Sequence, residues 1–302
     1  MITFVYAVLV FQVLRFTVSL FNFLSNPKLG YYGKHFTEPV SVIISGKRAE
    51  ATALLQSIQE QDYDQIEIFF KEEQEEETLL HQARGRYFLF LDAGNTIKKG
   101  MINNLIQRTK VFDLDLLSLI PNRKDLSFLE RCTLPLQDLL LLNLFPLRFV
   151  KLNQALLLSI ASKSCMFYNA QRYRLHHRSS PAAEPMKLKA EILLANKFVY
   201  ANDHPDLDEQ GRGLLRTLGR SVPVALLYLL LSLAGPLLML LNYDYVFLFL
   251  PLGLIFLTRM MTSFLTAQNP LYNVLLHPLQ MLMLVLLLLK ACWMKVFTSV
   301  QH

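Results

Sequence analysis

The sequence predicts an α/β domain with a doubly wound, mostly parallel sheet, combined with one amino-terminal and about three carboxy-terminal transmembrane helices. Two observations predict this class. Strand-like and helix-like patterns alternate through the central region, residues 37–205. Long apolar stretches flank that region, and 53% of the 302 residues are hydrophobic, which is too apolar for a soluble chain of this size.

The amino-terminal segment, residues 1–25, is predicted to be a transmembrane anchor. Its apolar run is long enough to cross a hydrocarbon core of roughly 30 Å. We expect a retained helix and not a cleaved signal, because no short apolar core is followed by an A-x-A-like site. A charge such as Arg15 is costly at mid-depth, so we expect its side chain to reach the interface or to face another helix.

The carboxy-terminal region, residues 222–295, contains the remaining apolar stretches. The first two, 222–242 and 244–258, are predicted to form a hairpin that turns at "LNYDY", where polar residues suit a turn and tyrosines suit the interface. The third, 271–290, contains His277-Pro278, which can kink the segment or turn it back. Its topology therefore stays open.

Residues 206–221 are predicted to form an interfacial amphipathic helix between the α/β domain and the membrane. Arg212, Arg216 and Arg220 recur at four-residue intervals and would face anionic lipid headgroups. The net charge of +6 is then explained by a membrane lipid partner and requires no nucleic acid.

The cations also predict the orientation. Nearly all Lys and Arg residues lie between 28 and 220, and none precedes the first segment. By the positive-inside tendency we expect an integral protein of the plasma (inner) membrane with its α/β domain in the cytoplasm. Three scattered cysteines, without CxxC spacing, indicate free thiols and neither a zinc site nor a disulfide framework.

The central region has the order strand, helix, strand, helix, strand. The strands are predicted at 39–45, 65–70 and 86–92. A sheet of this order binds ligands beyond the carboxyl ends of its strands. The polar residues that follow each strand are therefore the candidate site, in three groups: Ser45 to Arg48, Lys71 to Glu73, and Asp92 to Asn95.

These stretches carry a resemblance to a known family. "VSVIISGKRAEATALLQSIQEQDY", "QIEIFFKEE" and "GRYFLFLDAG" resemble the first three strand regions of membrane-associated family-2 glycosyltransferases of the GT-A type. The arrangement of apolar segments is similar to that of members that modify lipid or carotenoid acceptors. The resemblance implies transfer of a sugar from a nucleotide-sugar donor to a lipid or other membrane-bound acceptor, with Mg²⁺ or Mn²⁺ as cofactor.

The resemblance also implies roles for individual residues. Lys47 and Arg48 would contact donor phosphates, and Glu72 and Glu73 stand where the family has an aspartate pair that binds the nucleoside. Asp92 would be the metal carboxylate of the family's DxD motif, because a divalent cation neutralises the departing diphosphate.

The sequence departs from the family pattern at these places. Gly94 replaces the second Asp of DxD and leaves Asn95 as a neutral oxygen donor beside Asp92. The chain between Glu73 and "HQARGRY" is too short for the extra strand and loop that complete the nucleotide pocket in the family. Glu191 is the candidate catalytic base by its approximate place in the chain, and the alternative for it is a surface glutamate on a helix.

Two functions therefore stay open. The first is an active glycosyltransferase that uses Asp92, the donor phosphates and Glu191. The second is a catalytically degenerate relative without a cofactor, acting as a binding or assembly subunit with a membrane protein partner. Gly94 and the shortened second region separate the two. A transporter is a lesser third alternative, because the sequence contains no inverted repeat.

Overall fold

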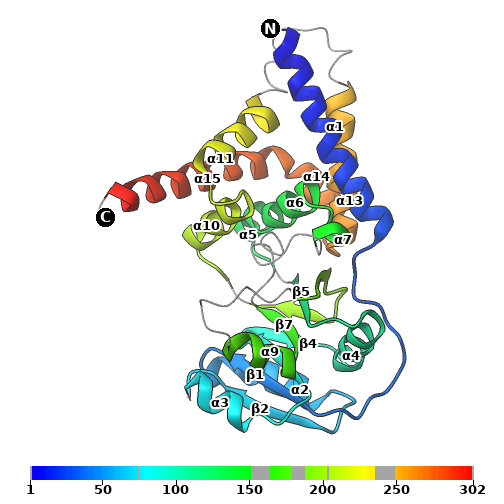
Figure 1. The fold of residues 1–302 in the computed structure, drawn as a ribbon. Helices are drawn as coiled ribbons and strands as arrows, with labels where there is room; N and C mark the ends of the chain where they lie inside the picture. The colour runs from blue at the N-terminus through cyan, green and yellow to red at the C-terminus, as the bar shows by residue number, and fades with distance from the viewer. Residues whose placement is uncertain are drawn as a thin grey trace. The chain divides into compact units, whose positions relative to one another are not determined.

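The computed structural model describes most of the chain, namely residues 2–73, 75–124, 126–150, 164–178, 188–202, 204–234 and 249–300. The chain forms two compact units (Figure 1). The α/β unit comprises Pro27–Lys124 and Leu147–Asp203. The helical unit comprises Met1–Asn26, Asp125–Pro146 and His204–His302.

The α/β unit is built on a six-stranded sheet with the order β2-β1-β3-β7-β5-β8. The strands are β1 Val40–Ser45, β2 Ile66–Phe70, β3 Tyr87–Asp92, β5 Leu116–Ile120, β7 Cys165–Asn169 and β8 Ala190–Leu194. Strand β7 is antiparallel to both of its neighbours, and the other neighbouring pairs are parallel. The predicted mixed α/β class with a mostly parallel sheet is confirmed.

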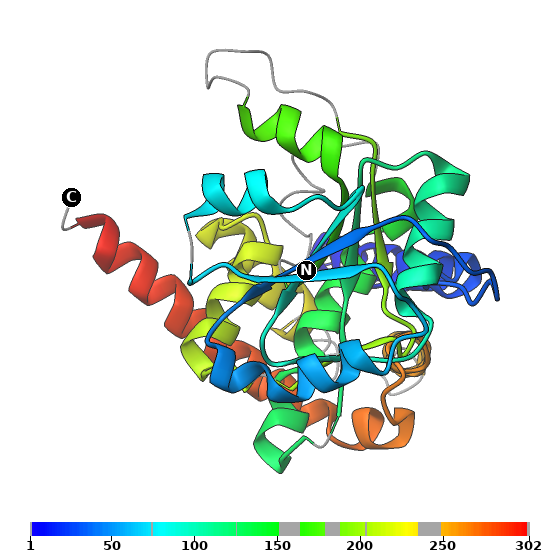
Figure 2. The same cartoon turned by 90° about the horizontal axis from the view of Figure 1, so that it is seen from below.

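Both faces of this sheet are buried, which explains why its central strands are apolar without alternation. In β1, Val42 and Ile44 pack in a cluster with Leu54 of α2 (Thr52–Gln59), while Ile43 packs in a second cluster with Leu79 of α3 (Glu76–Gln82). Helix α4 (Met101–Phe112) contributes Leu105 to the first cluster, and α9 (Ala170–Arg178) contributes to the second. Figure 2 shows the helices around the sheet from below.

A smaller sheet of order β4-β9-β6 completes the α/β unit. It consists of β4 Asn95–Ile97, β9 Val199–Ala201 and β6 Asn122–Arg123. Between β2 and β3, the described residues form α3 and no strand, so β2 is an edge of the large sheet. The connection between β2 and β3 is therefore as short as the sequence predicts, without the extra strand. The remaining helices are the 3₁₀ turn η1 Arg48–Ala51 and α7 Leu147–Val150.

The helical unit gathers three separate parts of the chain. Its helices are α1 Ile2–Ser25, α5 Phe128–Thr133, α6 Pro135–Leu144, α10 Leu207–Thr217, α11 Val222–Leu229 with a π turn over Leu230–Ala234, α13 Phe249–Leu265, α14 Pro270–Leu275 and α15 His277–Val300. Helix α1 packs against α13 and α6, and α10 packs against α15. The predicted α/β domain, residues 37–205, includes α5 and α6, whereas in the structure these two helices belong to the helical unit.

Among the residues that the structure describes, two helices, α1 and α15, are long and apolar enough to cross a membrane. Helices α10 and α11 form a third span only if they count as one, and they meet at a bend of 93°. The predicted hairpin turn at 241–245 lies outside the described residues. The predicted segment 271–290 is divided, because α14 ends at Leu275 and α15 begins at His277.

The region 206–221, predicted to be an interfacial helix, contains helix α10, which is shorter than the arginine spacing predicts. Asp206 caps its start by accepting a hydrogen bond from the Glu209 amide at 2.6 Å. The helix ends at Thr217, and Arg220 follows it in a turn with φ of 56°. Arg220 therefore does not continue the helical row of Arg212 and Arg216.

Candidate functional site

The carboxyl ends of β1, β2 and β3 meet at one edge of the large sheet. Strand β1 is parallel to both neighbours, and its last residue, Ser45, is in register with Asp92. The Ala93 amide donates to the Ser45 carbonyl at 2.8 Å, and the Lys71 amide donates to the Ile44 carbonyl at 2.9 Å. The structure thus brings together the three groups of polar residues that the sequence singled out.

Gly46 allows the first of these loops to lie against the third. Its φ is 108°, in the region that glycine adopts most readily. A Cβ atom at this position would lie 2.9 Å from the Cβ of Ala93, closer than two carbons can approach. The loop after β1 and the turn after β3 are therefore packed directly on each other.

The charged residues of this edge are mostly exposed. Arg48 Nη1 lies 3.6 Å from Glu73 Oε1, and its guanidinium lies over the Phe70 ring at 5.1 Å. Lys47 and Glu72 are exposed beside this pair. An ion pair with side chains 68% and 47% exposed contributes little stability. A phosphate group could displace it at low cost.

Asp92 ends β3 and is half-buried. Its charge, added to the larger effect of complete burial, raises the pKa of the neighbouring Cys165 thiol and keeps that thiol neutral. Asn95 is buried in β4, and its side-chain amide donates to the Ser164 carbonyl at 2.7 Å. This hydrogen bond uses the amide nitrogen and fixes the orientation of the side chain, whose oxygen was the atom expected beside Asp92. Among the described residues, no group of three or more His, Cys, Asp or Glu side chains could hold a metal ion.

Glu191 has surroundings unlike those of a surface glutamate on a helix, and that alternative is wrong. It lies in β8, and its side chain is only 6% exposed. Arg108 donates to it from Nε at 2.8 Å and from Nη2 at 2.7 Å. Arg148 Nη1 donates a third hydrogen bond at 2.8 Å. Burial alone would lower the pKa of Arg108, but the hydrogen bonds and charge of Glu191 hold it above its ordinary value.

The sheet register separates Glu191 from Asp92. Across the sheet, Glu191 of β8 is in register with Leu117 of β5, and Leu117 is in register with Phe167 of β7. Phe167 is in turn in register with Leu89 of β3, which lies three positions before Asp92. Three strand spacings across the sheet and three residues along it give a backbone separation of about 17 Å. The structure thus gathers Lys47, Arg48, Glu72, Glu73 and Asp92 at one edge and places Glu191 at a different part of the sheet.

Arg108 and Arg148 are not among the site residues predicted from the sequence. The sequence contains a pattern that indicates burial of Arg108. Met101, Leu105 and Arg108 follow helical spacing and fall on one buried face of α4. An arginine on such a face requires a buried partner. No local pattern marks Arg148, since it meets Glu191 from a position 43 residues away.

Comparisons with known proteins found only distant similarities. No protein-family model matches the sequence. No curated protein matches it either. Among solved structures, the chain is similar to the mannosyltransferase PcManGT from Pyrobaculum calidifontis in complex with GDP-Man and Mn²⁺, with 12% identity, a TM-score of 0.47, and coverage of 96% of this chain and 99% of the other. It is also similar to S. aureus TarS 1–349 in complex with UDP-GlcNAc, with 13% identity, a TM-score of 0.37, and coverage of 83% and 90%.

Proposed function

We propose that this protein is a membrane-associated relative of the family-2 glycosyltransferases that acts as a binding or assembly subunit and does not transfer sugar. The observation that carries the proposal is the environment of Glu191. Its carboxylate accepts three hydrogen bonds from two arginines and is almost fully buried. A base must reach the proton that it removes, and here both carboxylate oxygens are buried and already accept hydrogen bonds from arginines.

Its distance from Asp92 supports the same proposal. The acceptor must attack the sugar while the metal holds the donor diphosphate, so base and metal ligand must both lie within a few ångströms of one donor molecule. A backbone separation of about 17 Å, derived from the register, would require both side chains to extend towards one donor molecule, whereas the Glu191 carboxylate is bound to Arg108 and Arg148. Gly94 also leaves the turn with Asp92 as its one carboxylate.

An active transferase is the second candidate, and one observation favours it. Lys47, Arg48, Glu72, Glu73 and Asp92 share an exposed edge where parallel strands end, which suits a nucleotide diphosphate. In this case Asp92 and the donor phosphates would hold Mg²⁺ or Mn²⁺, because magnesium can use few protein ligands when phosphates complete its shell. The base would then be a residue other than Glu191.

The experiment that separates the two is calorimetry of the full-length protein in detergent. Uridine and guanosine diphosphate sugars are titrated with and without Mg²⁺ or Mn²⁺, and sugar release is measured on the same samples. The proposal predicts neither metal-dependent binding nor transfer. Metal-dependent binding together with transfer that Asp92→Asn abolishes, and that the matched exposed variant Asp64→Asn preserves, would overturn it.

A further inference from the structure

A pocket in the helical unit is lined by positively charged side chains. It lies between α10 and α15, which pack against each other (Figure 1), and its volume is about 440 Å³. Small-molecule sites have volumes of roughly 300 to 1,000 Å³, so this pocket can admit a group much larger than a water molecule. Ala291 and Met294 supply apolar lining. The cations of the pocket are Arg212, Arg216, Arg220 and Lys295.

The turn after α10 brings the cations of this helix together with that of α15. Arg212 and Arg216 lie one helical turn apart, on the same face of α10. The chain then turns at Gly219 and Arg220, where φ is 69° and 56°. The Arg220 carbonyl accepts a hydrogen bond from Lys295 Nζ. Arg220 therefore leaves the helical row but still lines the pocket.

No carboxylate among the described residues forms an ion pair with the three arginines of the pocket, Arg212, Arg216 and Arg220. Asp208, one turn before Arg212, is instead held by Lys290 Nζ at 2.5 Å. A cleft lined by charges of one sign concentrates ions of the opposite sign. The ligand that suits this pocket is therefore an anion.

Helix α10 sets the depth of the pocket. Its residues Arg212 and Arg216 are exposed, and such charges are costly in the hydrocarbon core of a membrane. The helix packs closely on α15, since a Cβ atom at Gly211 would lie 2.9 Å from the Leu287 carbonyl oxygen and 3.4 Å from the Cβ of Ala291. The part of α15 from Leu287 onwards therefore shares the level of a charged helix, which is the level of lipid headgroups.

An exposed apolar stripe of α15 adjoins the pocket. Its residues recur at intervals of three or four and fall on one face of the helix: Leu282, Leu286, Leu289 and Trp293. Trp293 is 67% exposed and directly precedes the pocket residue Met294. Tryptophan is enriched where a membrane meets water, and a contiguous exposed apolar surface marks contact with a membrane or a protein. An anion that carries acyl chains matches both the cations and this stripe, whereas a soluble anion matches the cations alone.

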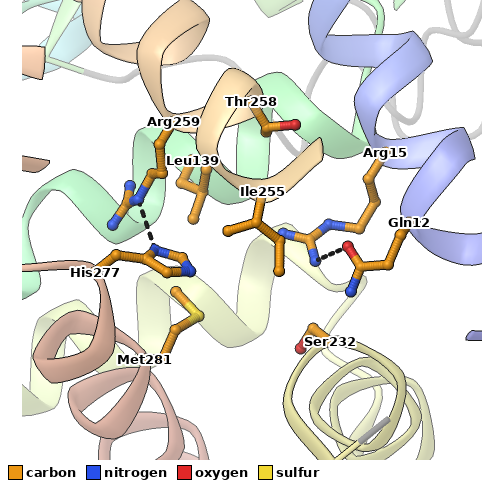
Figure 3. Close-up of a pocket in the computed structure, with 9 residues that line it drawn as sticks. All are labelled: Gln12, Arg15, Leu139, Ser232, Ile255, Thr258, Arg259, His277 and Met281. Atoms are coloured by element: carbon orange, nitrogen blue, oxygen red, sulfur yellow. Dashed lines mark hydrogen bonds between the residues drawn. The ribbon is translucent and has the colours of Figure 1, made fainter. Parts of the chain in front are cut away.

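A smaller cavity of the helical unit also contains arginines, but it does not suit a headgroup. Arg15 of α1 and Arg259 of α13 line it together with His277 (Figure 3). Its volume of about 10 Å³ holds one group the size of a water molecule. Arg259 Nε donates to His277 Nδ1 at 3.0 Å, and the charge of Asp138 acts on Arg259. Of these two cavities, only the one between α10 and α15 has room for a lipid headgroup.

We propose that the pocket between α10 and α15 binds the phosphate headgroup of an anionic membrane lipid. In this site Arg212, Arg216 and Arg220 donate hydrogen bonds to phosphate oxygens, and Lys295 adds a fourth positive charge. The acyl chains lie along the apolar stripe of α15. An interfacial helix attracts anionic lipids in general, whereas this site retains one lipid molecule at a defined place. The site is formed by the helical unit alone and does not depend on the proposed function.

The single tryptophan of the chain, Trp293, provides a local readout for this site. Phosphatidylglycerol with brominated acyl chains, which quench tryptophan fluorescence on contact, is titrated into the full-length protein in maltoside micelles. We expect saturable quenching by this lipid, and weak, non-saturating quenching by brominated phosphatidylcholine, whose headgroup has no net charge. Soluble glycerol phosphate at the same concentration should not compete. Equal quenching by both lipids, or competition by glycerol phosphate, contradicts a site for an anionic lipid.

Two double variants separate the pocket from general electrostatic attraction. Arg212→Gln/Arg216→Gln should weaken the saturable binding roughly tenfold or more, because two phosphate donors are lost. Lys98→Gln/Lys99→Gln removes the same charge from exposed positions of the α/β unit and should leave the binding unchanged. All four side chains are exposed, so both variants are expected to fold, and circular dichroism checks this. An equal loss of binding in the two double variants contradicts the pocket.

A third variant keeps every charge and fills the pocket. Met294→Trp places a larger side chain in the lining. Retention of phosphatidylglycerol is measured by native mass spectrometry, because a second tryptophan would obscure the fluorescence of Trp293. We expect the retained lipid to be lost. If Met294→Trp retains phosphatidylglycerol as the wild-type protein does, the lipid is attracted by surface charge without occupying the pocket, and the proposal is wrong.

Discussion

Arg108 of α4 and Glu191 of β8 form a bidentate ion pair inside the α/β unit, with hydrogen bonds of 2.8 and 2.7 Å. The two residues are 83 positions apart in the chain, so the pair joins a helix to an edge strand that the chain supplies much later. Fork-to-fork contacts of this kind are directional as well as strong, and they fix the helix on the sheet.

The first prediction concerns the stability of this pair. Glu191→Gln should lower the free energy of unfolding by about 3 kcal/mol, because it leaves the charges of Arg108 and Arg148 without compensation. Urea denaturation followed by circular dichroism measures the change, with exposed Asp64→Asn as the control. The double variant Arg108→Met/Glu191→Leu should recover much of the loss. A loss below about 1 kcal/mol for Glu191→Gln would show that the pair is dispensable.

The second prediction concerns the turn after β3. Under the proposed function, Asp92→Asn should change stability by roughly 0.5 kcal/mol and leave calorimetric binding of nucleotide sugars unaltered. Gly94→Asp restores a second carboxylate and gives the complementary measurement. It should strengthen Mn²⁺ binding only if the rest of a nucleotide pocket is intact. Tight Mn²⁺ binding by Gly94→Asp with a nucleotide sugar would therefore favour the active transferase.

The strand boundaries could be predicted closely from the sequence because their signal is local. The runs predicted at 39–45, 65–70 and 86–92 begin one residue before the observed β1, β2 and β3. Short, mostly apolar runs between polar loops identify strands, and their order with intervening helices favours parallel pairing. The short connection between β2 and β3 is also predictable from the sequence, because it follows from the number of residues between the two strands.

The rest of the α/β unit depends on non-local information. The direction of β7 is not encoded in its own residues, and its antiparallel pairing with β3 and β5 follows from how the chain returns to the sheet. Glu191 illustrates the same limit in the candidate site. Its place in the chain suggested a base, but its role depends on Arg108 and Arg148, which reach it from other elements.

The third prediction concerns acid stability of the helical unit. Ser127 donates to Glu130 in a capping box, and this bond, followed by contact with His204, lowers the pKa of Glu130 to about 2. Because the pKa of Glu130 is lower in the folded state than in the unfolded state, its ionised carboxylate stabilises the protein at pH values above the unfolded pKa of 4.5. This stabilisation is lost as the pH falls through about 2. Glu130→Gln, which can keep the capping geometry, should flatten the decline of the unfolding midpoint over this pH range. An unchanged slope would contradict the assignment.

The fourth prediction concerns orientation. Lys98 is exposed in the α/β unit, and the cation distribution predicts that this unit is cytoplasmic. A Lys98→Cys variant in intact cells should react with a membrane-impermeant maleimide only after permeabilisation. The native thiols Cys132, Cys165 and Cys292 are all buried, so the wild-type protein provides a low background. If intact cells were labelled as strongly as permeabilised cells, the predicted cytoplasmic location of this unit would be wrong.

The interleaved order of the helical unit has a consequence for biosynthesis. Helix α1 ends at Ser25, whereas its partner α13 begins at Phe249. At typical rates of translation, α1 therefore leaves the ribosome about 10 to 45 s before α13 exists. The last strand of the α/β unit, β9, ends at Ala201, so that unit can close in the interval. Until α13 has been synthesised, the Arg15 side chain lacks the residues of α13 that line the same cavity in the folded protein.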